Sequence, residues 1–151
     1  MSIEKNIENF LFPNHSNENK NDLIGLFFGS FNPIHNGHMI IANYMLEFTD
    51  LDKIYFIVSP QNPFKKQENL LEDYHRLAIV NEVIGDSYDY IASDIEFKMP
   101  KPSYTIDTLT YLKEKYPTKH FSLIMGSDNL KNFHKWKNAD RILEEHKLYV
   151  Y

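Results

Sequence analysis

The hydrophobic residues of this chain gather in five short runs that are separated by more polar stretches. These runs span residues 23–28 (LIGLFF), 53–59 (KIYFIVS), 88–93 (YDYIAS), 121–126 (FSLIMG) and 147–151 (KLYVY). Short runs with little polar alternation are typical of strands that are covered on both faces of a sheet. The sequence therefore predicts five strands, of which the one at 88–93 has the weakest pattern.

Between these runs, apolar residues recur at the three- and four-residue spacing of a helix surface. One series consists of Tyr74, Leu77, Val80 and Ile84, and another of Ile106, Leu109, Leu112 and Tyr116. Pro117 supplies a stop for the second helix. The segment 37–48 is apolar on more than one side, so we expect a helix packed deep against the sheet. Alternating strands and helices predict right-handed crossovers and a parallel α/β sheet, which binds ligands beyond the carboxyl ends of its strands.

The expected domain covers residues 23–151, behind a flexible polar leader over residues 1–22. Residues 13–22 (PNHSNENKND) are polar and rich in Asn, and a short helix is expected before them, over residues 2–11. A chain of 151 residues with 42% apolar content has the length of one ordinary domain and enough apolar surface for a core.

The composition of the chain excludes several kinds of binding partner and site. A net charge of −5 and a pI near 5.8 provide no broad basic field for a nucleic-acid backbone, so we expect no nucleic acid as partner. The absence of cysteine excludes disulfides, thiolate catalysis and cysteine-based zinc sites. No signal-peptide core and no apolar run of about 20 residues stands out, which predicts a soluble cytoplasmic protein without a membrane anchor.

The candidate chemistry lies at the first strand-to-helix junction, within GLFFGSFNPIHNGHMIIANYML (25–46). If the strand ends at Phe28, residues 29–33 form a loop at the carboxyl edge of the sheet, and Asn36 is placed to cap a helix that starts at Gly37. The free N–H groups of the first turn would then form an anion site, which His35 and His38 can both reach. Gly37 has no Cβ to hinder a ligand from approaching the backbone.

Other interpretations of this junction have less support. A single histidine at a helix start is usually a cap or a surface group. The dinucleotide fingerprint G-x-G-x-x-G and the Walker A pattern are both absent, so an NAD-dependent dehydrogenase and a P-loop enzyme are not indicated.

The string GSFNPIHNGH (29–38) resembles the H-x-G-H signature of the nucleotidyltransferase superfamily. Further segments resemble the bacterial nicotinate mononucleotide adenylyltransferases, in the same order along the chain: SPQNPFKK (59–66), YHRLAIV (74–80), DIEFKMPKPSYTIDTL (94–109) and LIMGSDNLKNFHKW (123–136). This resemblance implies a Rossmann-like, doubly wound parallel sheet of about five strands with helices on both faces. It also implies adenylyl transfer from ATP to nicotinate mononucleotide, which yields deamido-NAD and pyrophosphate.

The resemblance also assigns site residues. His35 and His38 are the expected catalytic pair. The expected ATP-binding residues are Gly29, Ser30, Phe31, His35, His38, Gly126 and Asp128. The expected acceptor-binding residues are Asn62, Lys65, Lys66, Arg76, Tyr104, Thr105, Thr108 and Trp136, with the indole of Trp136 stacked on the pyridine ring. Mg²⁺ is expected to bind through the ATP phosphates, without a dedicated metal site. For Trp136 the alternative is core packing, and for Asp128 it is capping of the next helix.

Alternatives remain within the superfamily and outside it. Phosphopantetheine adenylyltransferases and cytidylyltransferases share the H-x-G-H loop, and a noncatalytic nucleotide-binding module is a third candidate. Family members continue past LYVY to an I-S-x-T-x-[IV]-R segment, so a chain that stops at Tyr151 is expected to be truncated or degenerate relative to them. The preference between acid and amide mononucleotides stays open, as does the oligomeric state, for which a homo-oligomer is one candidate.

Overall fold

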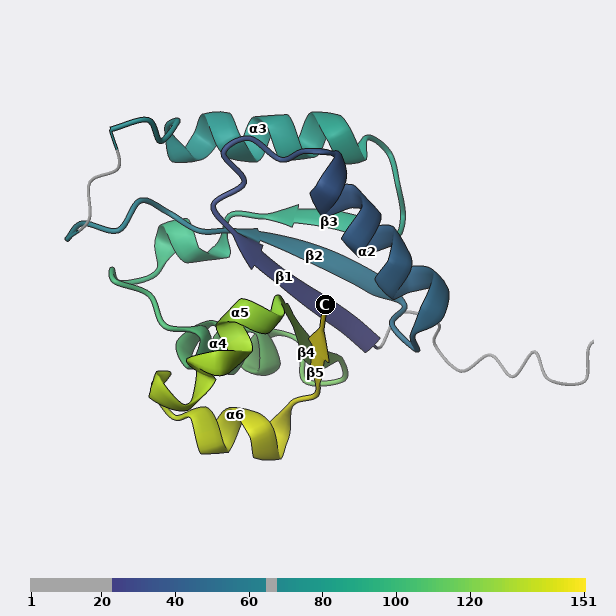
Figure 1. Ribbon diagram of the computed structural model, residues 1–151, viewed down its shortest axis with the longest axis vertical. Helices are drawn as coiled ribbons and strands as arrows, with labels where there is room; N and C mark the ends of the chain where they lie inside the picture. Colours follow the sequence, from purple (N-terminus) through teal and green to yellow (C-terminus); the bar gives the residue numbers. More distant parts are fainter. Residues whose placement is uncertain (1–22, 65–67) are drawn as a thin grey trace, which may run out of the picture.

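The computed structural model describes residues 23–64 and 68–151 (Figure 1). The predicted leader over residues 1–22, with its helix over residues 2–11, lies outside the described residues. The same holds for Lys65 and Lys66.

A parallel sheet of five strands forms the centre of the molecule. The strands are β1 (Leu23–Gly29), β2 (Lys53–Val58), β3 (Tyr90–Ser93), β4 (His120–Met125) and β5 (Leu148–Val150), and their order is β3-β2-β1-β4-β5. All four neighbouring pairs are parallel. The five predicted strands and the parallel sheet are therefore confirmed, with ends that shift by one or two residues.

Helices cover both faces of this sheet. The α-helices are α2 (Asn36–Phe48), α3 (Asp73–Ile84), α4 (Thr105–Lys115), α5 (Ser127–Lys131) and α6 (Ala139–Glu145), and the 3₁₀ turns are η1 (Ile95–Lys98) and η2 (Phe133–Lys135). In Figure 1, α2 and α3 lie above the sheet, whereas α4 and α6 lie below it. This arrangement confirms the doubly wound fold. The short elements α6, η1 and η2 were not predicted, and α5 entered only as a helix that Asp128 could cap, because all four are too brief to show a helical period.

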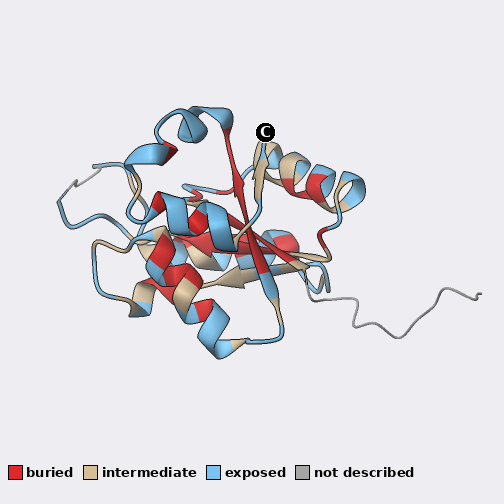
Figure 2. Cartoon of the chain, turned by 90° about the horizontal axis from the view of Figure 1, so that it is seen from below, coloured by how far each residue is buried: buried red, intermediate tan, exposed pale blue. Residues whose placement is uncertain are grey.

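The sheet separates two apolar clusters. Leu26 belongs to the cluster that contains α4 and α6, and the next residue, Phe27, belongs to the cluster that contains α2 and α3. Successive side chains of a strand point to opposite faces, so a continuous apolar run supplies both clusters at once. Figure 2 shows the buried strands between helices that are buried on one side only. Each fully buried Leu or Phe stabilises the fold by about 1.5–3 kcal/mol.

The helix α2 differs from the expectation that it packs deep against the sheet. Only Ala42 and Met45 are buried, whereas Ile40, Tyr44 and Phe48 are 68%, 57% and 73% exposed. The helix carries apolar residues on two sides, but only one side reaches the sheet. The rings of Tyr44 and Phe48 pack on each other on the outer side, with centroids 4.7 Å apart.

The strand order reverses between β1 and β4. The chain first adds β2 and β3 on one side of β1 and then returns to add β4 and β5 on the other. The loops after β1 and β4 therefore flank the crevice in which ligands of such sheets bind. Among the residues that the structure describes, no helix has the length and apolar character that crossing a membrane requires.

Candidate active site

The loop after β1 brings the two histidines together at the start of α2. His35, and not Asn36 as expected, is the N-cap residue. Its Nδ1 accepts a hydrogen bond from the Gly37 N–H (3.1 Å), while the His38 Nδ1 accepts one from the His35 N–H (3.1 Å). This is a capping box in which imidazoles take the places that hydroxyl and carboxyl groups usually occupy. The expectation was wrong because Asn is a common N-cap and His is not.

The geometry of the pair determines where its protons lie. The two rings stack with centroids 3.8 Å apart and an interplanar angle of 30°. A nitrogen that accepts a hydrogen bond carries no proton, so each neutral ring carries its proton on Nε2. Each ring therefore has its Nδ1 tied to the backbone and its Nε2–H left as the donor for another group.

The surroundings of His38 favour its neutral form. Burial lowers the pKa of the half-buried His38 below 6.5, and the neighbouring His35 lowers it further. A phosphate oxyanion near the rings would act in the opposite direction, since an opposite charge stabilises imidazolium. The protonation of His38 is thus sensitive to the charge of a ligand at this helix end.

Gly37 has a structural role that was not expected, whereas the expected access of a ligand to its backbone stays a prediction. A Cβ at this position would lie 2.9 Å from Cε1 and 3.0 Å from Nδ1 of the His35 ring. Both distances are shorter than nearly all real Cβ contacts. Gly37 therefore makes room for the imidazole that caps the helix.

The side chain of Phe31 packs against the ring of His38. Its backbone is left-handed, with φ of 47°, and its side chain is 2% exposed. The ring meets the His38 ring edge-on at a centroid distance of 5.0 Å, and it lies over Gly29, where a Cβ would be 3.1 Å away. Ser30 is exposed on the same loop. Of the predicted ATP-binding residues on this loop, Phe31 contacts His38, while Gly29 packs against the Phe31 ring and Ser30 lies between them in the chain.

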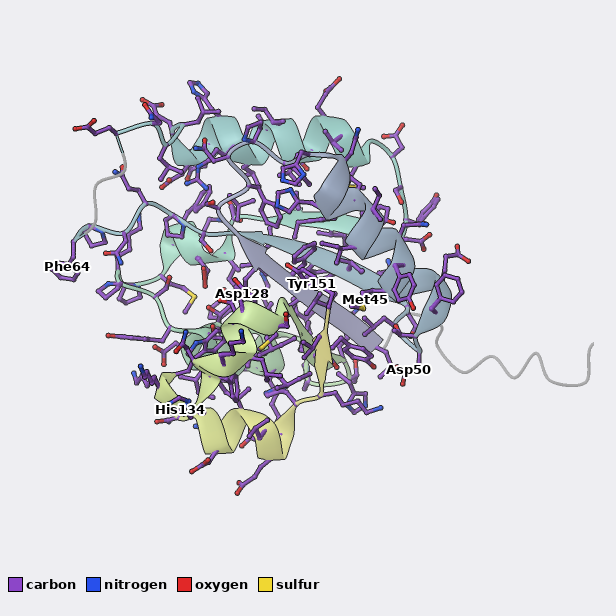
Figure 3. The ribbon with its side chains drawn as sticks, viewed as in Figure 1. Met45, Asp50, Phe64, Asp128, His134 and Tyr151 are labelled. Atoms are coloured by element: carbon purple, nitrogen blue, oxygen red, sulfur yellow. The ribbon has the colours of Figure 1, made fainter. Side chains whose placement is uncertain are left out.

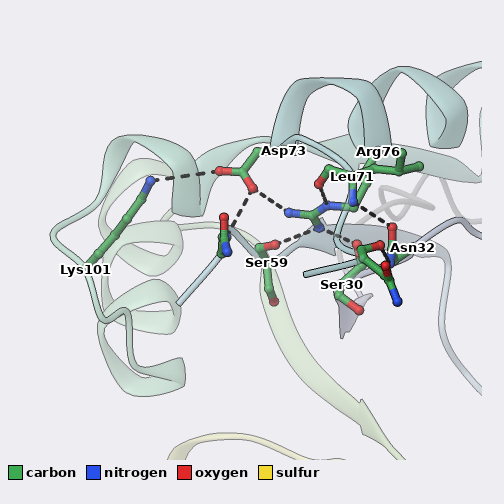
Figure 4. Close-up of polar contacts among 9 residues, drawn as sticks. Ser30, Asn32, Ser59, Leu71, Asp73, Arg76 and Lys101 are labelled. Carbon is green, nitrogen blue, oxygen red and sulfur yellow. Dashed lines mark hydrogen bonds and ion pairs between the residues drawn. The ribbon is translucent and has the colours of Figure 1, made fainter. Parts of the chain in front are cut away.

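Arg76 does not occupy the position expected of an acceptor-binding residue. Its side chain is fully buried, and its guanidinium donates to the carbonyl oxygens of Leu71 (2.9 Å), Ser59 (2.8 Å) and Ser30 (Figure 4). It also pairs with Asp73 at 2.5 Å. Arg76 therefore binds three segments of the protein to one another. Nothing in the local pattern around Arg76 indicates this, because surface and buried arginines look alike in a sequence.

Two adjoining cavities lie around the segment that leads into α4, and the first of them reaches the ends of β1 and β2. The first has a volume of about 260 Å³ and is lined by Phe28, Ser59, Pro60, Gln61, Asn62, Pro63, Glu96, Lys101, Pro102, Ser103 and Thr105. The second has a volume of about 310 Å³ and is lined by Ser103, Tyr104, Thr105, Lys135, Trp136 and Lys137. Ser103 and Thr105 line both cavities. Four of the predicted acceptor residues thus line these two adjoining cavities: Asn62 the first, Tyr104 and Trp136 the second, and Thr105 both.

Trp136 combines the two roles that were considered for it. The half-buried indole packs on Phe133 with ring centroids 5.1 Å apart, and it also lines the second cavity. In the lining of the same cavity, the Lys137 ammonium lies 4.8 Å from the centre of the Tyr104 ring. Tyr104 is the N-cap residue of α4 and makes no side-chain cap, so the first N–H groups of this helix border the cavity without a capping side chain.

Thr108 also departs from the expectation of an acceptor contact. It is fully buried, and its hydroxyl donates to Oε2 of Glu96 at 2.9 Å. Glu96 is only 4% exposed and was not singled out in the sequence. Burial raises the pKa of this carboxyl group, and hydrogen bonds from Thr108 and Ser59 partly oppose that effect.

The loop after β4 brings Asp128 to the crevice. A Cβ on Gly126 would clash with Oδ1 of Asp128, so this glycine lets the carboxylate fold over the backbone. Asp128 is exposed and makes no cap of α5, so its capping alternative has no support. Tyr151 lies beside it, as Figure 3 shows, and the Ser127 N–H donates to the Tyr151 carbonyl at 2.8 Å. Burial and Asp128 raise the pKa of Tyr151.

The part of the chain that the structure describes contains no group of three or more His, Asp and Glu side chains placed to hold a metal ion.

Comparisons with known proteins fit this arrangement. The model of the cytidylyltransferase-like family matches residues 26–151. A relative from Cytophaga hutchinsonii is 58% identical over 128 residues, which are 85% of this chain and 67% of the relative. One from Flavobacterium johnsoniae is 59% identical over 128 residues, 85% of this chain and 66% of the relative. Both are described as probable nicotinate-nucleotide adenylyltransferases, and the chain spans about two thirds of their length.

A solved structure confirms the fold. Nicotinic acid mononucleotide adenylyltransferase from Plasmodium falciparum, in complex with NaAD, matches with a TM-score of 0.67 and 20% identity. The match covers 86% of this chain and 74% of that one. The chain thus belongs to the cytidylyltransferase-like family, among the nicotinate-nucleotide adenylyltransferases.

Proposed function

We propose that this protein transfers the adenylyl group of ATP to nicotinate mononucleotide, giving deamido-NAD and pyrophosphate, a step of NAD biosynthesis. The observation that carries the proposal is the reciprocal cap at His35 and His38, which fixes two Nε2–H donors at a helix N-terminus. Such a site suits an anion on which charge shifts between oxygens.

The proposed reaction is a direct displacement. A phosphate oxygen of the mononucleotide attacks the α-phosphorus of ATP, the bond between that phosphorus and the bridging oxygen breaks, and pyrophosphate leaves with the bonding electrons. The two imidazoles donate Nε2–H bonds to oxygens of the triphosphate and stabilise the charge that develops there. No covalent intermediate with the protein is needed.

The two cavities supply the acceptor side of the proposal. Trp136 stacks on the pyridine ring, and the N-terminus of α4 at Tyr104 and Thr105 receives the carboxylate of the ring. Asn62, Lys65 and Lys66 approach the acceptor phosphate, although the two lysines lie outside the described residues. Gly126 and Asp128 accommodate the adenosine, with Asp128 accepting hydrogen bonds from ribose hydroxyls.

Mg²⁺ enters this proposal as part of the ATP complex. It neutralises charge on the phosphate oxygens and keeps most of its water, so few protein ligands are required. In this proposal the residues of the chain orient the two substrates and do not form a metal centre.

The test is pyrophosphate release by the full chain with Mg²⁺, ATP and nicotinate mononucleotide, with the dinucleotide identified by mass. Nicotinamide mononucleotide, phosphopantetheine and CTP are the comparison substrates, and a His35→Ala/His38→Ala variant is the matched blank. We expect release with the acid mononucleotide and ATP. If none of the acceptors leads to release while ATP still binds, a noncatalytic nucleotide-binding module would be supported instead.

A further inference from the structure

A third cavity lies apart from the two cavities that the proposed reaction uses. It has a volume of about 360 Å³ and is bordered by β2, β3, η1 and the C-terminal half of α4. Its apolar lining includes Ile91, Met99 and Leu112, and it shares no lining residue with the first two cavities. Sites for small molecules have about this size and combine apolar walls with a few polar groups that orient the ligand. The polar groups of the third cavity therefore indicate which kind of molecule it would hold.

The hydroxyl of Tyr55, on β2, is open to this cavity. Tyr55 is only 8% exposed and packs in the apolar cluster on the α4 side of the sheet, with its ring centroid 6.4 Å from that of Phe121. Its hydroxyl forms no hydrogen bond to a residue that the structure describes, although every fully buried side-chain nitrogen or oxygen there has a partner. The hydroxyl oxygen is therefore not sealed in the core, and the space that it meets is the cavity that Tyr55 lines.

A hydroxyl at this position has no structural task within the chain. Phenylalanine would fill the same apolar surroundings without a polar group, and a buried polar group that lacks a partner destabilises the fold. Burial and the neighbouring Tyr116 raise the pKa of Tyr55, so the phenol stays protonated at neutral pH and can donate a hydrogen bond. The inner end of the cavity thus offers a donor to a ligand atom that accepts.

The outer end of the cavity carries a positive charge. Of the two lysines in the lining, Lys98 forms an ion pair with Asp94 at 3.3 Å, and Asp94 is the one carboxylate among the described lining residues. Within the described part of the chain, the exposed Lys115 has no carboxylate within ion-pair distance. Its ammonium lies 5.4 Å from the centre of the Tyr116 ring and 5.9 Å from that of Tyr111. The aromatic rings hold this ammonium at the rim, where it can pair with an anion.

We propose that the third cavity binds a small aromatic carboxylate that carries a second hydrogen-bond acceptor across the ring from the carboxylate. The ring packs between Ile91 and Leu112, the second acceptor receives the hydrogen bond of Tyr55, and the carboxylate pairs with Lys115. This site goes beyond the proposed adenylyl transfer and does not depend on it. A binding measurement therefore tests it whether or not the protein releases pyrophosphate.

The test uses 4-hydroxybenzoate as the probe and the methyl group of Met99, in the lining of the third cavity, as the reporter. NMR spectra of the full chain are recorded with isotope-labelled methionine methyl groups. We expect a saturable shift of the Met99 signal with a Kd of about 1 mM or lower. The signal of Met45, which lies in the apolar cluster on the other face of the sheet, should not move. A Met99 signal that stays in place up to about 10 mM probe would overturn the proposal.

Two related compounds test the two ends of the ligand separately. Benzoate lacks the hydroxyl that would accept from Tyr55, and 4-hydroxybenzamide lacks the charge that would pair with Lys115. We expect each of them to bind the wild-type protein about threefold or more weakly than 4-hydroxybenzoate. Equal affinities of the three compounds would mean that only the ring is recognised, which would contradict the proposed class of ligand.

The variant Tyr55→Phe removes the donor and keeps the ring. Its affinity for 4-hydroxybenzoate should fall by about threefold to tenfold, while its affinity for benzoate stays within about twofold. Equal losses for both acids would show that the two hydroxyls do not meet. If the variant does not fold, the three compounds with the wild-type protein still decide.

The variant Lys115→Gln should weaken both acids by about threefold and leave 4-hydroxybenzamide unchanged. Lys113→Gln is the matched control on the same helix, because Lys113 pairs with Glu145 at 3.6 Å and does not line the cavity. Equal effects of the two lysine variants would indicate a general effect of charge and would refute a carboxylate site at Lys115.

Two further measurements separate other occupants from the proposed one. A probe that binds beside Trp136 would lose affinity in Trp136→Ala, whereas we expect the Met99 titration to be the same in that variant. A second copy of the chain on this face would shift the Met99 signal with protein concentration alone and would appear as a dimer in sedimentation equilibrium. Either a loss in Trp136→Ala or such a dimer would overturn the proposal.

Discussion

The two sides of the cleft are built by different means. On the histidine side, backbone N–H groups fix both imidazoles, Gly37 fits closely against His35, and the Phe31 ring supports His38. On the α4 side, the cavity is lined by Tyr104, which is 45% exposed, and by the half-buried Trp136. The first side is held by hydrogen bonds and close packing, and the second by surface aromatic contacts.

Under the proposed function, this difference corresponds to two tasks, the chemical step on the histidine side and substrate recognition on the α4 side. Groups that stabilise a transition state have to be preorganised, because any reorganisation during the reaction raises the barrier. Groups that recognise a planar ring need area and orientation, which an aromatic side chain with few rotatable bonds provides. Substitutions on the histidine side should therefore change kcat, and substitutions on the α4 side should change KM for the acceptor.

The largest effect is expected for His38→Ala. It removes an Nε2–H donor and also the acceptor of the His35 N–H, so kcat should fall by about 10²–10³-fold. Measurement of kcat and of the unfolding midpoint in urea separates the two losses. A rate equal to that of the wild type would rule out a catalytic histidine side.

Gly37→Ala should disrupt the histidine side of the cleft without removing a functional group. The new Cβ displaces the His35 ring, which should lower kcat by about 10-fold or more, whereas alanine stabilises a helix by about 0.5–1 kcal/mol relative to glycine. Steady-state kinetics and urea denaturation measure the two effects separately.

Gly85→Ala is its matched control, because Gly85 caps α3 with φ of 55° and a Cβ added there would meet no atom within 4 Å. That variant should lose about 1–3 kcal/mol of stability, because its backbone conformation is one that side chains rarely adopt, and it should keep its kcat. If both glycine variants lose activity equally, the clash at His35 is not the cause.

Trp136→Ala tests the recognition side. We expect KM for the mononucleotide to rise by about tenfold, KM for ATP to stay within about twofold, and Trp136→Phe to recover most of the loss. Steady-state kinetics with each substrate varied in turn provide the comparison. Equal losses for both substrates would indicate that the indole mainly packs on Phe133.

The titration of His38 gives a smaller effect. NMR of the unliganded protein should place its pKa below 6.5, and His35→Ala should raise it only in part, because burial is the larger cause. Since the folded-state pKa is lowered, the unfolded chain binds more protons just below pH 6.5. The contribution of His38 to stability is thus present above pH 6.5 and is lost as the pH falls through the folded-state pKa.

Glu96 should show the opposite sign. Its folded-state pKa is raised above 4.5, so its contribution to stability is present below pH 4.5 and is lost as the pH rises through the folded-state pKa. The stability of Glu96→Gln relative to the wild type should therefore increase from pH 4 to pH 7 in urea denaturation. An unchanged difference across this range would mean that Glu96 ionises as freely as a surface residue.

Residues that form local patterns were predictable from the sequence, and residues defined by distant partners were not. The five strands and the histidine loop follow from apolar runs and from residues that are adjacent in the chain. Arg76 and Thr108 were expected at the acceptor, but both are buried. Arg76 binds the carbonyl of Ser30, which lies far from it along the sequence. Thr108 binds Glu96, a residue that the sequence analysis did not single out. The outer side of α2 was misjudged because apolar content alone does not show which side meets the sheet.

The same Nδ1 atoms cap α2 and orient the two imidazoles of the proposed site, so we expect heat inactivation to begin in the first turn of this helix. If the first turn of α2 frays, both imidazoles lose the hydrogen bonds that orient them, although the sheet remains folded. On heating, we expect turnover to stop at a lower temperature than the one at which the whole protein unfolds cooperatively.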